Sequence, residues 1–146
     1  MTVNIVQATP VHAESWDKYV SAHSQATPYH RYAWIQSVEQ AYKHKNASLV
    51  ALEEDQVVGI FPCIGMKKPF SSIKYCALPF CDIGFGLADN QDILRLLQTH
   101  ATERLKNSGG TSLEYRDSEH QTVESQEQGM KVRMVLPLPD SADELM

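Results

Sequence analysis

The sequence LVALEEDQVVGIFPCI, residues 49–64, consists of two apolar runs joined by a short polar link. The two runs are Leu49 to Leu52 and Val57 to Ile64. Apolar runs separated in this way predict a β-hairpin, with the link Glu53 to Gln56 as its turn. Gly59 and Pro62 weaken the interior of the second strand, so a bulge or a sheet edge is expected there.

One strand and two helices are expected before this hairpin. The short strand is Asn4 to Ala8, and Thr9-Pro10 then supplies an N-cap residue followed by proline at the first helical position. The first helix places four residues on one face, namely Trp16, Tyr19, Val20 and His23. The second helix has its apolar residues at helical spacing, at Trp34, Ile35, Val38, Ala41 and Tyr42.

A strand, a helix and another strand are expected after the hairpin. The first strand is Ile73 to Leu78, and the irregular, glycine-containing segment Pro79 to Gly86 follows it. The helix is expected to begin near Asp89 or Asn90, because one apolar stripe runs along the residues that follow, at Ile93, Leu94, Leu96, Leu97, Ala101 and Leu105. It ends at Asn107 to Gly110, before the strand Ser112 to Arg116. This order predicts a right-handed βαβ crossover.

The C-terminal part of the sequence is expected to be a polar loop followed by one more strand. Residues 117–129 carry four acids and few apolar residues, which is typical of a loop. Residues 132–136 read as a strand, and residues 140–146 resemble the beginning of another helix. We therefore expect one domain over residues 1–139, with 140–146 as the start of a second, missing domain or a disordered tail.

The composition is that of one globular domain with a mildly acidic surface. The 146 residues contain 13 Lys and Arg against 18 Asp and Glu, so the formal charge is 13 − 18 = −5. This acidity argues against a domain that binds DNA along its phosphate backbone, although a small local basic site remains compatible with it.

The sequence predicts a cytoplasmic protein without a structural metal. Its N-terminus lacks the pattern of a secretory signal, and no apolar run approaches the length of a membrane span, so no membrane insertion is expected. Three cysteines, Cys63, Cys76 and Cys81, are odd in number and lack CxxC spacing. Disulfides and a zinc site are therefore not expected, and Cys63 and Cys76, which lie in apolar stretches, are expected to be small buried residues.

The predicted order of elements resembles that of the GNAT acyltransferase fold, an α/β fold with a mixed, mostly antiparallel sheet and helices on both faces. Several segments resemble FemAB-like acyltransferases of the exosortase/PEP-CTERM-associated type in their order and spacing. These segments are Ala26-Thr27-Pro28-Tyr29-His30 followed by Trp34, Val57 to Pro62 with Lys67-Lys68, Leu78-Pro79-Phe80, Leu87-Ala88-Asp89, and Leu113 to Arg116. The resemblance spans nearly the whole sequence.

This resemblance implies a function in acyl transfer. Members of the family look like two GNAT-type domains in tandem, which transfer an acyl or aminoacyl group to an amine. The present sequence resembles the first domain, and is expected to form one wall of the substrate groove and to be inactive alone. The implied donor is acyl-CoA or an aminoacyl-tRNA. The implied acceptor is a small molecule or a peptidoglycan or polysaccharide precursor.

Six residues are predicted to line that wall: Tyr29, His30, Lys67, Asp82, Gly84 and Arg116. An imidazole such as His30 can deprotonate an attacking amine near neutral pH, but a partly buried histidine, with Trp34 in the core, is the alternative. Lys67 and Lys68 form either a phosphate-binding pair or a solvated turn. Glu114 and Arg116 share one face of their strand, where they either form ion pairs with each other's neighbours or face the groove. The sequence nominates no catalytic residue.

The segment Gly84-Phe85-Gly86 bears on whether the chain binds acyl-CoA as its donor. Binding of a pyrophosphate needs free backbone N–H groups at a helix N-terminus, usually beside closely spaced glycines. Gly84-Phe85-Gly86 lacks the usual Gln/Arg-x-x-Gly-x-Gly/Ala order, and Asp89 or Asn90 is placed to cap the helix that follows. A structural turn is therefore expected.

Two other functions remain open. In the first, the chain is a non-catalytic binding or assembly module that forms a homodimer, because a half without its partner domain exposes an apolar patch. In the second, the chain is a stand-alone N-acetyltransferase that uses acyl-CoA. Binding of acyl-CoA distinguishes this last function from the others.

Overall fold

The computed structural model describes residues 2–116. The predicted loop 117–129, the predicted strand 132–136 and the predicted boundary after residue 139 lie outside the described residues. Within 2–116 the helices are α1 (Ala13–Ala22), α2 (Tyr32–Tyr42) and α3 (Gln91–Asn107), with short 3-10 turns at Pro10–His12 and Pro28–His30. The strands are β1 (Asn4–Gln7), β2 (Lys45–Asn46), β3 (Leu49–Glu53), β4 (Gln56–Phe61), β5 (Ile64–Met66), β6 (Lys74–Cys76), β7 (Leu87–Ala88) and β8 (Ser112–Glu114).

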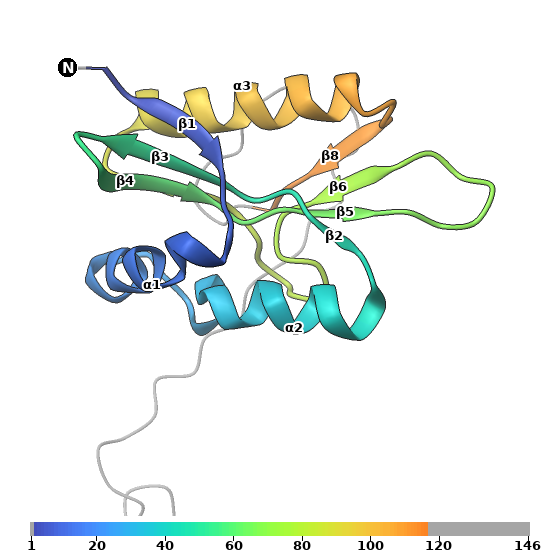
Figure 1. Cartoon of the computed structure of the whole chain (residues 1–146), viewed down its shortest axis with the longest axis horizontal. Coiled ribbons are helices and arrows are strands. Elements are labelled where there is room, and N and C mark those ends of the chain that lie inside the picture. The colour runs from blue at the N-terminus through green and yellow to red at the C-terminus, as the bar shows by residue number, and fades with distance from the viewer. Residues whose placement is uncertain (1, 117–146) are drawn as a thin grey trace, which may run out of the picture.

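The described residues form three layers, with the strands between α3 on one face and α1 and α2 on the other (Figure 1). Two four-stranded sheets have the orders β1-β3-β4-β7 and β2-β5-β6-β8. All pairings are antiparallel except that of β6 with β8, which is parallel. The predicted α/β class, with a mostly antiparallel sheet and helices on both faces, is confirmed.

The predicted hairpin is present with a bulge next to Gly59, but its second strand, expected to run from Val57 to Ile64, is divided into β4 and β5, which belong to different sheets. Ala51 pairs with Gly59 and Leu52 pairs with Val57, so Val58 is the extra residue of a β-bulge. The strand then stops at Phe61, and β5 begins only at Ile64. Proline has no backbone N–H to donate to the ladder, so Pro62 interrupts the pairing here.

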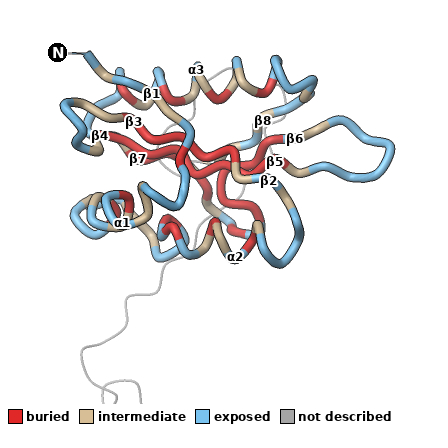
Figure 2. The backbone as a smooth tube through the Cα atoms, viewed as in Figure 1, coloured by how far each residue is buried: buried red, intermediate tan, exposed pale blue. Residues whose placement is uncertain are grey.

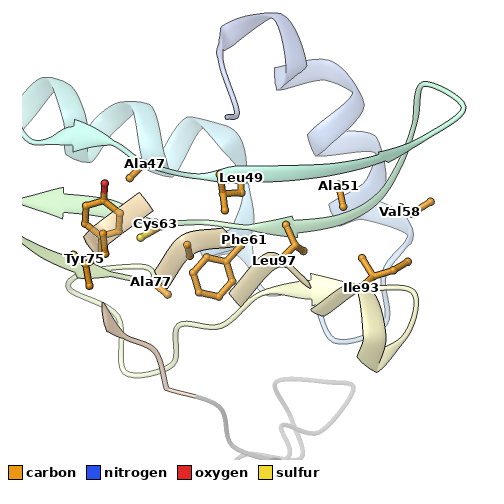
Figure 3. Packing of buried hydrophobic residues seen from close by; sticks show 12 residues of the cluster. Ala47, Leu49, Ala51, Val58, Phe61, Cys63, Tyr75, Ala77, Ile93 and Leu97 are labelled. Atoms are coloured by element: carbon orange, nitrogen blue, oxygen red, sulfur yellow. The ribbon is translucent and has the colours of Figure 1, made fainter. Parts of the chain in front are cut away.

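Alternate residues of the central strands face opposite helices, which explains why both runs of the hairpin are continuously apolar. Leu49 and Ala51 belong to the core cluster that α3 covers, whereas Val50 lies in the cluster beneath α1 and α2. Strands buried on both faces lose the alternation of apolar and polar residues. Figure 2 shows the resulting band of buried residues through the middle of the molecule, and Figure 3 shows the α3 side of the core around Phe61.

The buried face of helix α2 is shorter than its periodicity predicted. Tyr32, Ile35 and Val38 are buried, whereas Ala41 and Tyr42 at its C-terminal end are exposed. A helix contributes to the core only along the part of its length that lies against the sheet. The periodicity of the sequence continues past that part, so the prediction extended the buried face one turn too far.

Helix α3 begins and ends as predicted, and four of its stripe residues are buried, at Ile93, Leu97, Ala101 and Leu105. Leu94 is half-buried and Leu96 is 43% exposed, so the apolar stripe is narrower than expected. The strand after the helix pairs in parallel with β6, as the predicted crossover requires. Within the described residues, none of the helices has both the length and the apolar character needed to cross a membrane.

Leu96 and Leu97 provide a matched test of this packing. Replacing Leu97, which is 0% exposed, with alanine leaves a cavity between α3 and the sheet. We expect Leu97→Ala to lower the free energy of unfolding by about 3 kcal/mol. Leu96→Ala should lower it by less than about 1 kcal/mol, since this side chain is already partly in water. Urea unfolding followed by circular dichroism measures both. Equal losses would show that α3 presents a different face to the sheet.

Candidate functional site

Most of the predicted site residues gather around the segment that leaves the sheet between β6 and β7. This segment, residues 77–86, is called the excursion loop below. It has two aromatic contacts. Phe80 packs on Tyr42 at the end of helix α2, with ring centroids 4.8 Å apart, and Phe85 packs at 5.0 Å on His30 in the 3-10 turn that precedes the helix. The loop therefore connects the two four-stranded sheets, called the half-sheets below, and contacts the C-terminal end of α2.

His30 is fully buried, and both of its ring nitrogens are engaged. Its Nδ1 lies 3.0 Å from the backbone N–H of Thr27, which donates to it, and also contacts the Thr27 hydroxyl at 2.9 Å. Nε2 lies 3.1 Å from the carbonyl oxygen of Phe85. Because an N–H must donate and a carbonyl must accept, the proton is on Nε2. Burial lowers the pKa of His30 from 6.5 to about 4, against the opposing effect of its backbone hydrogen bonds.

This arrangement fits the alternative of a buried histidine. A general base needs a free lone pair within reach of the substrate proton, and the only lone pair of His30 already accepts the N–H of Thr27. Trp34 is half-buried and packs edge-to-face on Tyr29 at 5.0 Å. Tyr29 itself is 46% exposed and is therefore available to a ligand.

Gly84 and Arg116 are brought together by an isolated antiparallel bridge. The Gly84 N–H donates to the Arg116 carbonyl at 3.0 Å, and the Arg116 N–H donates to the Gly84 carbonyl at 2.6 Å. A Cβ on residue 84 would lie 2.0 Å from the carbonyl oxygen of Ala77, so only glycine fits. The role of this glycine in the described structure is thus to let two backbone segments approach closely.

The Arg116 side chain joins a small polar cluster beside the excursion loop. Its Nε lies 3.4 Å from Glu114 Oε1, so the two residues that share a strand face form an ion pair. A terminal nitrogen of the guanidinium also lies 4.0 Å from the sulfur of Cys76. Burial raises the pKa of the Cys76 and Cys81 thiols, and the positive charge of Arg116 acts in the opposite direction on both. Both thiols are thus held protonated, as expected of buried cysteines.

Asp82 and Lys67 are both exposed but lie in different places. Asp82 belongs to the excursion loop, where its charge contributes to raising the pKa of Cys81. Lys67 follows β5 and begins the β5–β6 hairpin, which projects away from the body of the molecule (Figure 1). The structure therefore brings His30, Asp82, Gly84 and Arg116 to the excursion loop, with Tyr29 next to His30, but it does not bring Lys67 there.

An aromatic patch that the sequence did not predict lies at the C-terminal end of α2. It consists of Tyr42, His44 and Phe80: Tyr42 is 57% exposed and Phe80 is 61% exposed, and the Tyr42 and His44 rings stack at 6.0 Å. Phe80 has φ 68° and Leu78 has φ 48°, in the left-handed region that disfavours non-glycine residues. The backbone thus tolerates strain while holding a large ring in solvent. No local sequence signal marks this patch, because Phe80 and Tyr42 are distant in the sequence.

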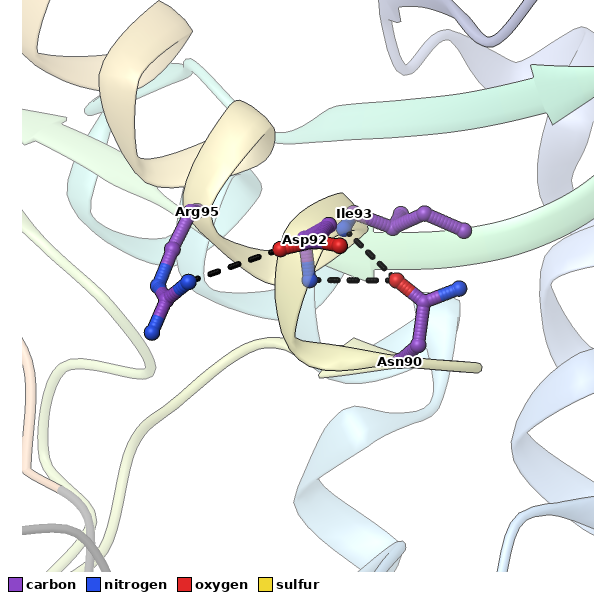
Figure 4. A network of polar contacts seen from close by, with 4 residues as sticks. All are labelled: Asn90, Asp92, Ile93 and Arg95. Carbon is purple, nitrogen blue, oxygen red and sulfur yellow. Dashed lines mark hydrogen bonds and ion pairs between the residues drawn. The ribbon is translucent and has the colours of Figure 1, made fainter.

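The N-terminus of α3, where a pyrophosphate would bind, already has its own cap. Asn90 Oδ1 accepts hydrogen bonds from the backbone N–H groups of Asp92 at 3.1 Å and Ile93 at 3.0 Å (Figure 4). The carboxylate of Asp92 stands beside these amides and pairs with Arg95 at 3.4 Å. Asp89 precedes the cap and accepts a hydrogen bond from the Tyr19 hydroxyl at 2.8 Å.

The residues present therefore do not fit the pyrophosphate of coenzyme A. Two of the amides that would bind it are used by the cap, and the carboxylates of Asp89 and Asp92 would repel it. The glycine before the helix is not an open cradle either. A Cβ on Gly86 would lie 2.7 Å from a ring carbon of Phe61 and 2.9 Å from a methyl carbon of Leu94. The segment is held as a close backbone contact: Gly84 forms the bridge to Arg116, and Gly86 packs against the core.

Comparison with solved structures identifies the fold. No family model matches the sequence, and no curated protein matches it. The ribosomal-protein-alanine N-acetyltransferase from Brucella melitensis biovar Abortus 2308 superposes with a TM-score of 0.64 at 11% identity, over 92% of this chain and 100% of that one. An acetyltransferase from Trypanosoma brucei gives 0.64 at 12% identity, over 92% and 100%. The chain has a GNAT-like fold.

A third GNAT-like neighbour was solved with CoA bound. The aminoglycoside N-acetyltransferase AAC(6')-Iy, solved in complex with CoA, superposes with a TM-score of 0.58 at 18% identity, over 91% of this chain and 95% of that one. Identities this low establish the GNAT-like fold alone, and folds host many functions. The capped start of α3 is a feature of the present chain, observed in its own hydrogen bonds.

His30 gives the site a testable pH dependence. Its folded-state pKa of about 4 lies below the 6.5 of an unperturbed histidine, so the unfolded chain binds the extra proton more readily. The stabilisation is therefore present above pH 6.5 and is lost as the pH falls toward 4. Lowering the pH from about 7 to about 5 should cost about 2 kcal/mol at this residue.

The His30→Asn variant should show a smaller loss over the same range in urea unfolding, with His100→Asn, a substitution at a half-buried histidine of α3, as control for the mutation chemistry. NMR titration of the His30 ring protons measures the pKa directly. A value near that of a free histidine would contradict the buried, doubly bonded arrangement.

Proposed function

We propose that this chain is the first half of a FemAB-like acyl- or aminoacyltransferase and forms one wall of the groove in which an amine is acylated. The observation that carries the proposal is the capped N-terminus of α3 within a GNAT-like fold. The fold supports acyl transfer, and the cap argues against the donor that a stand-alone acetyltransferase would use. The resemblance of the sequence to FemAB-like proteins supplies the other part of the argument.

The wall is formed by the excursion loop and the end of α2. Tyr42, Phe80 and the carboxylate of Asp82 are exposed on these elements, and Tyr29 is exposed on the 3-10 turn that precedes α2. Aromatic faces and a carboxylate both attract an ammonium group, which is the form of most amines at neutral pH. This chemistry suits an amine acceptor, either a small molecule or the amino group of a peptidoglycan or polysaccharide precursor.

The reaction also needs a base, because an ammonium must lose a proton before its nitrogen can attack the acyl carbon. The free nitrogen lone pair then forms the new bond, and the donor's leaving group departs with the bonding electrons. His30 has both nitrogens engaged. In this proposal the second domain therefore supplies the base and the present chain positions the acceptor, so the chain alone is expected to be inactive.

Two observations favour the other candidate functions. The exposed rings of Tyr42 and Phe80 would be covered equally well by a second copy of the chain, as a homodimeric assembly module requires. The Brucella neighbour is matched over 100% of its own length, which favours a stand-alone acetyltransferase. Binding of acyl-CoA and the mass in solution distinguish these functions from the proposed one.

We expect the purified chain to bind neither acetyl-CoA nor CoA in isothermal titration calorimetry, and its melting temperature to stay unchanged in their presence. The double variant Asn90→Gly with Asp92→Asn frees the two capped amides and removes one negative charge. If the cap excludes the pyrophosphate, this variant should gain measurable CoA affinity. The single variant Asp92→Asn, which keeps the cap, is the matched control.

Light scattering of the same samples completes the test. A monomer that ignores acyl-CoA and gains acyl-transfer activity only with a second GNAT-like domain supports the proposal. A dimer whose mass falls in Phe80→Ser would favour the assembly module instead. Micromolar acetyl-CoA binding by the unmodified chain, together with acetylation of amines, would make this a stand-alone acetyltransferase and contradict the half-enzyme.

A further inference from the structure

The hairpin between β5 and β6 projects beyond the rest of the described structure and is exposed along its whole end (Figures 1 and 2). Lys67, Lys68 and Pro69 are exposed, and Phe70 is fully exposed, at 110% of the reference value. Phe70 is the most exposed of the large hydrophobic residues in the described part of the chain. A phenylalanine in this position gains nothing from the folded core.

The turn that carries Phe70 is closed by a hydrogen bond from the Ser71 N–H to the Lys68 carbonyl at 3.2 Å. Pro69 and Phe70 are its two central residues. Proline suits the first central position, but Phe70 at the second has φ 59°, where turns of this kind normally have glycine. The chain therefore accepts both backbone strain and the exposure of a large apolar ring. Strained backbone conformations of this kind cluster at functional sites.

The charge around this turn has one sign. Between Gln56 and Cys81 the sequence contains no acid, and its charged residues are Lys67, Lys68 and Lys74, all exposed. The acids Glu53 to Asp55 form the β3–β4 turn, which lies at the opposite end of the molecule (Figure 1). A chain with net charge −5 thus presents a basic hairpin at one end and an acidic turn at the other. Against a negative surface this separation orients the molecule with the hairpin first.

We propose that the β5–β6 hairpin docks on the surface of a membrane that contains anionic lipids. Phe70 enters the interfacial region below the headgroups, and Lys67 and Lys68 lie against the headgroup phosphates. An apolar ring flanked by lysines matches the two layers of such a surface, which attracts cations and accepts apolar side chains. The contact is made by one turn from one side and needs no spanning helix. It does not depend on the proposed acyl transfer.

The basic residues of the hairpin are all lysines, which favours a lipid surface over a nucleic acid. All three are lysines, which act as flexible point charges and suit the diffuse negative potential of a bilayer. The hairpin contains no arginine, whose planar group binds phosphates and base edges in a fixed geometry. Two or three lysines also contact too few phosphates for tight binding to the backbone of a nucleic acid.

Co-sedimentation of the whole chain with vesicles tests this docking. We expect binding to vesicles of phosphatidylcholine mixed with phosphatidylglycerol, little binding to phosphatidylcholine alone, and weakening with added salt. Reversing both charges in Lys67→Glu with Lys68→Glu should reduce the partition coefficient by about tenfold or more, and Phe70→Ser by about tenfold. The matched controls are Lys18→Glu and Val11→Ser, an exposed lysine on α1 and an apolar residue that is 88% exposed elsewhere. Both should bind as the unmodified chain does.

A second readout reports on the ring itself. In Phe70→Trp the new indole should shift its emission to the blue on mixed vesicles and be quenched by brominated lipid chains, whereas it should remain water-exposed without vesicles. Binding that the control variants lose equally, or an indole that stays in water while the protein is bound, would overturn the proposal. So would binding to single-stranded RNA that these hairpin variants abolish while vesicle binding is absent, since the hairpin would then serve a nucleic acid.

Discussion

Pro62 interrupts the hydrogen-bond ladder in the middle of the central hairpin, and the rest of the described structure accommodates that interruption. A buried break in a sheet leaves backbone groups without partners, which is costly unless something replaces them. The buried hydroxyl of Ser48 does so: it accepts from the Cys63 N–H at 2.9 Å and donates to the Cys63 carbonyl at 3.1 Å. The ladder then resumes as β2 with β5, so the two half-sheets separate while both remain fully bonded.

The separation of the half-sheets explains the excursion loop. β6 pairs in the second half-sheet and β7 in the first, so the chain must leave the sheet between them. Three long-range contacts hold the loop in place: the Gly84–Arg116 bridge, the Phe85 carbonyl on His30, and the Phe80 ring on Tyr42. His30 is therefore a positioning residue for the loop. Its depressed pKa follows from burial and is a consequence of this structural task rather than a sign of catalysis.

The capped N-terminus of α3 limits what the GNAT-like fold can bind at that helix. A helix N-terminus is an anion site only while its amides are free, and here the side chain of the capping residue Asn90 accepts hydrogen bonds from two of them. In the proposed function, the acceptor contacts the aromatic patch, Asp82 and Tyr29. At the far end of the second half-sheet, the basic hairpin offers a separate surface of different character. Acceptor recognition and attachment would thus occupy distinct parts of one small domain.

The features that the sequence by itself determined are those set by neighbours along the chain. The turn Glu53 to Gln56 and a cap at Asp89 or Asn90 each follow from the chemistry of a few adjacent residues, so local reasoning found them, although at Pro62 it expected only a bulge or an edge. The tertiary structure alone decided that Tyr42 and Leu96 face water, and that His30 meets Phe85, 55 positions away. Periodicity shows that a helix has an apolar side, but only the position of the opposing sheet shows how much of that side is covered. Contacts between distant segments depend on where the backbone places them, which no local pattern contains.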